Sequence, residues 1–135
     1  MILLGRMLAW RAALPVLKWA LPLPRLVRLM AAPQAVDGRR PDRERAVAAL
    51  AHGLSGPRGV AALDNCLERS LVLYRYLGRS GARPELVVGV GKRDESVAGH
   101  VWVLLDGEAL YETPASLSEF APIVSFDAEG RSLSA

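Results

Sequence analysis

The chain of 135 residues contains a single cysteine, Cys66, within the stretch LDNCLERSLVLYRYL. Asp64 and Asn65 precede it, and both residue types favour the start of a helix. The unpaired amides and the positive dipole at a helix start stabilise a thiolate, and they can hold the oxyanion that forms when a carbonyl is attacked. A lone cysteine is most often a small buried residue. This position also makes Cys66 a candidate nucleophile, with its own backbone amide as an expected oxyanion donor.

A cysteine nucleophile needs a base to take its proton, and His100 lies downstream at the start of a predicted strand. An imidazole in this role is usually oriented by a carboxylate or an amide on its second nitrogen. Glu112 follows His100 by twelve residues and is the candidate for that group. Trp102 shares a strand face with His100, where it can wall the site or serve as a core aromatic.

The turn between the two predicted strands decides whether His100 and Glu112 meet. A two-residue turn at Asp106-Gly107 places Glu112 on the opposite face of the sheet from His100. A three-residue loop with Gly107 in the left-handed conformation places His100 opposite Glu112, with facing Cβ atoms about 5 Å apart. The sequence allows both turns, and only the three-residue loop assembles Cys66, His100 and Glu112 on one face.

The elements around these residues predict an α+β fold. Apolar residues at helical spacing predict a helix from Cys66 to about Leu77. The segments ELVVGVG, GHVWVLLDGEALYE and FAPIVSF then predict a buried strand, a hairpin and a last strand, with KRDES as a polar loop. Upstream, PDRERAVAALAHGL predicts a helix that starts at Pro41. The expected arrangement packs the cysteine helix on an antiparallel sheet.

The N-terminal region differs in charge from the rest of the chain. Residues 1–45 carry nine basic and three acidic residues, a net charge of +6, whereas residues 46–135 carry eight basic and eleven acidic residues, a net charge of −3. We expect a basic amphipathic helical region over 1–32, a linker over 33–45 and the catalytic domain over 46–135, all in one compact unit. Arginines interrupt every apolar run before the roughly 20 residues that a membrane span needs.

Two interpretations of the basic region remain open. Its helices can pack on the domain while the arginines extend to solvent. They can also form a docking surface for a partner protein, an acidic peptide or a membrane face.

Composition limits the class of protein. Apolar residues make up 51% of the chain and charged residues 23%, which is typical of a globular domain and not of a disordered one. One cysteine excludes an internal disulfide and a multi-cysteine zinc site, and Cys66 with His100 provides too few ligands for a metal. We therefore expect no metal and no cofactor, no nucleic-acid partner, and a cytoplasmic setting.

The segments CLERSLVLYRYLGRSG, LVVGVG and GHVWVLLDG together resemble the leader-peptide peptidases of lasso-peptide and microcin biosynthesis. These are the B-type maturation proteins, which have a transglutaminase/papain-like fold. The resemblance is specific over residues 60–112. It implies a cysteine peptidase that removes the leader from a ribosomally made precursor. The family's nucleophile maps onto Cys66, its base onto His100, and its third residue, an aspartate, onto Glu112.

The resemblance also implies partners. The chain resembles the split form of the family, which works with a separate leader-recognition protein and passes the core peptide to an ATP-dependent cyclase.

Arg69 and Ser70 are expected to brace the start of the cysteine helix. Three residues depart from the family pattern, namely Val101, Leu104 and Glu112. Two alternatives to the peptidase function remain: an acyltransferase with the same triad, and a peptide-binding or membrane-surface module without catalysis.

Overall fold

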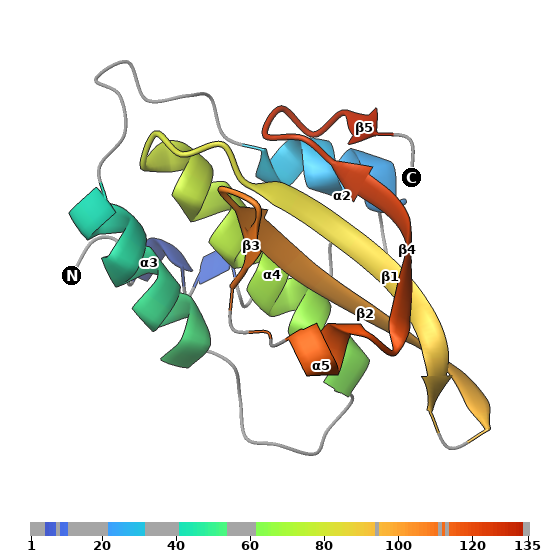
Figure 1. Cartoon of the computed structure of the whole chain (residues 1–135). Coiled ribbons are helices and arrows are strands. Elements are labelled where there is room, and N and C mark those ends of the chain that lie inside the picture. Colours follow the sequence, from blue (N-terminus) through green and yellow to red (C-terminus); the bar gives the residue numbers. More distant parts are fainter. Residues whose placement is uncertain are drawn as a thin grey trace.

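The computed structural model describes residues 5–7, 9–10, 22–31, 41–53, 62–93, 95–110, 112 and 114–133 (Figure 1). The described residues form an antiparallel five-stranded sheet in the order β3-β2-β1-β4-β5, with helices packed against it. The predicted α+β class is confirmed.

Four helices have full bounds in the described part of the chain. They are α2 (Leu23–Met30), α3 (Pro41–Gly53), α4 (Ala62–Arg79) and α5 (Pro114–Leu117). The start of α3 at Pro41 agrees with the prediction, because a proline lacks the N–H that the first turn leaves unpaired. The helix that contains Cys66, α4, is longer than expected: it begins at Ala62, before Asp64 and Asn65, and it continues to Arg79.

The strands are β1 (Glu85–Arg93), β2 (Ser96–Leu105), β3 (Glu108–Ala109), β4 (Phe120–Phe126) and β5 (Ser132–Leu133). The prediction of a polar loop over KRDES is wrong for most of that segment. Lys92 and Arg93 extend β1, and Ser96 begins β2, with Arg93 paired to Ser96. Strand pairing continues to the tip because a tight hairpin connection needs only about two residues.

The core lies between α4 and one face of the sheet. Leu71, Tyr74 and Leu77 of α4 are almost fully buried there, and they share one cluster with side chains of three strands, which are Leu86, Val101, Val103 and Phe126. Figure 1 shows α4 running behind β1 and β2, with α5 on the other side of the sheet. This packing holds α4 firmly against β2.

Residues of the basic N-terminal region also enter this core. Met7, Leu26, Val27 and Met30 are fully or almost fully buried. Packing of this region on the domain is therefore observed for these residues, and the arginines of α2 remain exposed as the first interpretation requires. Among the helices that the structure describes, none combines the length and the apolar character needed to cross a bilayer.

Candidate active site

The helix that contains Cys66, α4, contacts one edge of β2, the strand that contains His100. The amide of Leu110 donates a hydrogen bond of 3.0 Å to the carbonyl oxygen of Val103, on the edge where β3 pairs. Residues two apart in a strand direct their carbonyls to the same side, so the carbonyl of Val101 points to this edge as well. There it accepts a buried 3.0 Å hydrogen bond from Oγ of Ser70, on α4. Beyond the end of β3, the same edge of β2 is therefore contacted by Ser70 of α4.

The structure brings His100 and Glu112 together. Nε2 of His100 lies 2.5 Å from Oε1 of Glu112, and the side chains are only 19% and 8% exposed. A carboxylate accepts hydrogen bonds, so the neutral imidazole that matches this pair is the tautomer with its hydrogen on Nε2. In that tautomer, Nδ1 carries the lone pair that can take a proton from a thiol.

The turn of the hairpin is the two-residue form. Leu105 pairs with Glu108, and Asp106 and Gly107 between them both have positive φ, 54° and 82°. Positive φ at both central residues is the type I′ turn, which matches the twist of a hairpin. The three-residue loop does not form.

The inference that only a three-residue loop could place Glu112 beside His100 is therefore wrong. It assumed that strand pairing continues to residue 112, whereas β3 ends at Ala109 and, among the described residues, the last hydrogen bond of this ladder comes from Leu110. Beyond that point the alternation of faces no longer governs the chain. Glu112 can turn toward His100 even though the register alone would point it away.

Two aromatic rings hold the imidazole in place. The His100 ring stacks on Trp102 at a centroid distance of 5.7 Å and on Phe120 at 5.0 Å. Trp102 is only 5% exposed, and it lies over Gly89, where an added Cβ would come within 2.8 Å of its ring. The glycine therefore makes room for the tryptophan, and the tryptophan supports the base.

The histidine lies on the sheet face away from the main core. Its neighbours Val101 and Val103 point into the core beneath α4, so His100 and Trp102 point to the other face. The pair of His100 and Glu112 thus lies on the outer face, next to the edge where Ser70 of α4 bonds to Val101.

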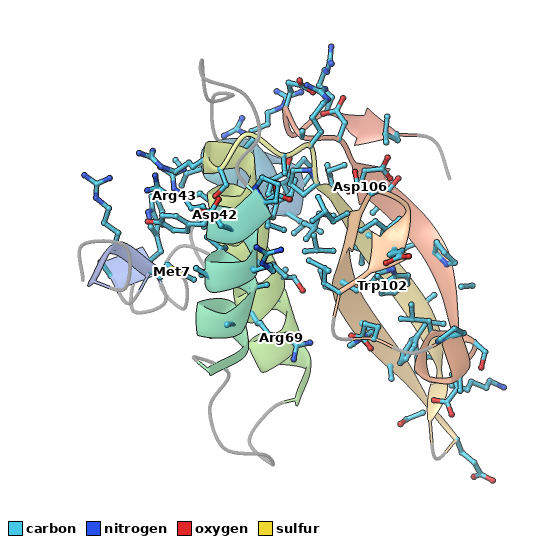
Figure 2. All side chains as sticks on the ribbon, turned by 60° about the vertical axis from the view of Figure 1, so that its left-hand side comes forward. Met7, Asp42, Arg43, Arg69, Trp102 and Asp106 are labelled. Atoms are coloured by element: carbon cyan, nitrogen blue, oxygen red, sulfur yellow. The ribbon has the colours of Figure 1, made fainter. Side chains whose placement is uncertain are left out.

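Arg69 of α4 reaches this pair. Its Nη2 lies 3.7 Å from Oε1 of Glu112, the same oxygen that pairs with His100. Figure 2 shows Arg69 on the lower part of α4, with Trp102 on the neighbouring sheet. Arg69 was expected to brace the start of the helix, and its contact with the site carboxylate was missed. Its position one helical turn after Cys66 was the available signal.

Cys66 lies on α4, four residues after Ala62 and four residues before Ser70. Positions four apart share a face of a helix, so position 66 lies one turn from the contact between Ser70 and Val101. In Figure 1, α4 and β2 both begin toward the lower part of the view. The side chain of Cys66 itself lies outside the described residues.

Because α4 begins at Ala62, the backbone amide of Cys66, the expected oxyanion donor, lies beyond the first four residues of the helix. In a regular α-helix that begins at Ala62, the amide of Cys66 bonds to the carbonyl of Ala62. The unpaired amides then belong to residues at or before the first turn. For the Cys66 amide to hold an oxyanion, the first turn of α4 must open, and its role stays a prediction.

A pocket of about 550 Å³ adjoins the site carboxylate. Its lining joins the hairpin turn to α5 and consists of Leu104, Gly107, Glu108, Ala109, Glu112, Pro114 and Leu117. Two of these residues, Glu108 and Glu112, are acidic, and the others are apolar or small. The pocket is large enough for a side chain of a bound peptide.

In a comparison with protein families, residues 5–125 match the model of the transglutaminase-like superfamily. No curated protein matches the chain, and no solved structure does. The match spans nearly the whole chain, including the basic N-terminal region as well as Cys66, His100 and Glu112. This chain therefore belongs to the transglutaminase-like superfamily.

Proposed function

We propose that the chain is a cysteine peptidase that removes the leader peptide from a ribosomally made lasso-peptide precursor. Membership of the transglutaminase-like superfamily indicates a cysteine-peptidase or acyltransferase type of activity. The observation that carries the proposal is the hydrogen-bonded pair of His100 and Glu112, beside the edge of β2 where Ser70 of α4 bonds to Val101. The lasso-peptide substrate rests on the resemblance of the motifs around Cys66 and His100.

In the proposed reaction, Nδ1 of His100 takes the thiol proton of Cys66, and the sulfur attacks the scissile carbonyl carbon. The imidazolium then gives its proton to the leaving amine of the core peptide, which leaves a thioester on Cys66. Water, activated by His100, hydrolyses the thioester and releases the leader as a free acid. Throughout these steps Glu112 holds the hydrogen on Nε2 and fixes the ring.

The pocket beside Glu112 is the proposed place for a substrate side chain close to the scissile bond. Leu104, Pro114 and Leu117 offer apolar contact there, and Glu108 and Glu112 add two carboxyl groups, so the pocket suits an apolar or basic side chain better than an acidic one. Trp102 acts mainly by supporting His100, because its ring is almost fully buried.

Partners follow from the same proposal. A separate recognition protein holds the leader, and the released core passes to an ATP-dependent cyclase in the cytoplasm. The basic N-terminal region is the proposed docking surface for the recognition protein, with Arg25 and Arg28 exposed on α2. Reversing both charges should weaken binding of that protein, as measured by calorimetry. Unchanged affinity would remove this surface from consideration.

The function is tested by intact mass spectrometry of a candidate precursor mixed with the recognition protein and either the native chain or Cys66→Ala. The native chain should release an unmodified leader acid and a core with a free amine, and Cys66→Ala should release neither. Cleavage by both variants would show that Cys66 is not the nucleophile.

An acyltransferase is the second candidate, because the superfamily chemistry and the same three residues serve either acceptor. In that case an amine, and not water, attacks the thioester. Adding a primary amine to the assay distinguishes acyl transfer from hydrolysis. Product that carries the amine even when the amine is dilute would favour acyl transfer, whereas a free carboxylate favours hydrolysis.

A further inference from the structure

A second pocket, of about 310 Å³, lies between the N-terminal helical residues and the later part of α4. Its lining consists of Arg6, Ala9, Trp10, Arg75, Tyr76 and Arg79. Three arginines therefore converge on one cavity, and no acidic residue lines it. We refer to it as the arginine pocket.

The arginines of this pocket lack a carboxylate partner within the part of the chain that the structure describes. Arg6 and Arg79 are exposed, and neither forms an ion pair there. Like charges that converge without a counter-charge repel one another, and a bound anion removes that repulsion. This arrangement differs from that of Arg83, which is paired with Glu129 at 2.6 Å.

Arg75 is held in position at the pocket while most of its donors stay unused. Its Nη1 donates a 3.1 Å hydrogen bond to the carbonyl of Leu29, and its guanidinium carbon lies 4.6 Å from the centre of the Trp10 ring. Its Nε is buried without a hydrogen-bond partner among the described residues. A guanidinium has five N–H donors, and because Nε is buried here, the donors left for an anion are those on the two Nη atoms.

The arginine pocket is distinct from the site at His100 and Glu112. Arg75 and Arg79 follow Ser70 by five and nine residues, which places them roughly 140° and 180° around the helix from it. Ser70 marks the side of α4 that contacts β2. Arg79 also lies about 20 Å along the helix axis from Cys66. A ligand in this pocket therefore does not touch the catalytic residues.

We propose that the arginine pocket binds a carboxylate on an acidic peptide segment. The three guanidinium groups recognise the carboxylate, and Ala9, Trp10 and Tyr76 provide apolar contact for the adjoining part of the peptide. A volume of about 310 Å³ is at the lower end of ligand pockets and accommodates one side chain with its neighbours. The proposal does not depend on peptidase activity, and binding can be measured without cleavage.

The test is fluorescence anisotropy with the full chain and a short glutamate-rich peptide that carries an uncharged dye. A peptide with glutamine at every glutamate position is the neutral comparison, and inorganic phosphate is the competing anion. The variant is Arg6→Gln with Arg79→Gln. The charge control is Lys92→Gln, at the exposed far end of β1, tested singly and compared with Arg79→Gln alone. Melting temperatures check that each variant is folded.

The acidic peptide should bind the native chain, and the glutamine peptide should not. The double variant should weaken binding by at least about tenfold, because it removes two charged donors. Lys92→Gln should change the affinity by less than about twofold, and added salt should weaken binding. Equal loss in Lys92→Gln and Arg79→Gln, or no loss in the double variant, would overturn the proposal. Displacement of the peptide by phosphate at a lower concentration than by acetate would assign the pocket to phosphate and also overturn it.

Discussion

Arg69 on α4 and Glu112 after β3 meet at 3.7 Å, on the same carboxylate oxygen that pairs with Nε2 of His100. This contact joins the helix that contains Cys66 to the acid that orients the proposed base. The site therefore contains three side chains in contact, from Arg69, Glu112 and His100, which come from three separate segments. Removing any one of these contacts should change the activity.

Glu112 should be essential for full activity because it holds the imidazole by its Nε2. Glu112→Ala should lower kcat/KM by at least about 100-fold, as expected when a general base loses its orientation. Glu112→Gln keeps a hydrogen-bond acceptor and should lose less. The measurement is steady-state cleavage of the precursor. Glu129→Ala, which removes an exposed carboxylate elsewhere, is the control, and an equal effect of the two alanine variants would contradict this role.

Arg69 should act as a positioning residue, since it contacts Glu112 and not the imidazole. Arg69→Gln should lower kcat by roughly fivefold, which corresponds to about 1 kcal/mol, with little change in KM. Arg69→Lys should recover part of the loss because it restores the charge without the fork. A change confined to KM would instead indicate that Arg69 binds substrate. Arg83→Gln, which breaks an exposed ion pair, should leave both constants unchanged.

Ser70 should contribute to stability through its buried hydrogen bond to the carbonyl of Val101. Ser70→Ala leaves that carbonyl without its donor and should lower the free energy of unfolding by about 1–3 kcal/mol. Urea unfolding followed by circular dichroism measures the change. Ser118→Ala removes an exposed bond to Ala115 and should cost much less. Similar costs for the two variants would mean that Ser70 does not fix α4 to β2.

Asp127 should make stability depend on pH. Burial alone would raise the pKa of the Asp127 carboxyl, but the amides of Arg131 and Glu129 and the guanidinium of Arg131 outweigh burial and hold the pKa below its usual value. A carboxyl with a lowered pKa in the folded state stabilises the fold above its unfolded pKa, and this contribution is lost as pH falls through the folded pKa.

The native chain should therefore melt at a higher temperature than Asp127→Asn near neutral pH. The difference should shrink as pH falls below about 4, where the unfolded carboxyl becomes protonated. Thermal unfolding of both variants across this range is the measurement. A difference that stays constant with pH would show that ionisation of Asp127 does not contribute. Because Tyr74 bonds to the backbone carbonyl of Asp127, that contact is kept in the variant.

Much of this protein follows from local patterns in its sequence. Apolar residues at helical spacing predicted α4, and the turn residues Asp106 and Gly107 predicted the hairpin, because periodicity and backbone preference act over a few residues. The types and order of Cys66, His100 and Glu112 identified the candidate site for the same reason: a nucleophile, a base and an acid are recognisable by their chemistry alone.

The tertiary structure decided how these residues meet. Only the fold shows that strand pairing of β3 ends at Ala109. Because Glu112 lies beyond the paired strand, its side chain can turn toward His100. Only the packing of α4 on β2 brings Arg69 to that carboxylate. The length of a strand ladder and the side on which a helix packs depend on contacts between residues far apart in the chain. No pattern within one segment contains that information.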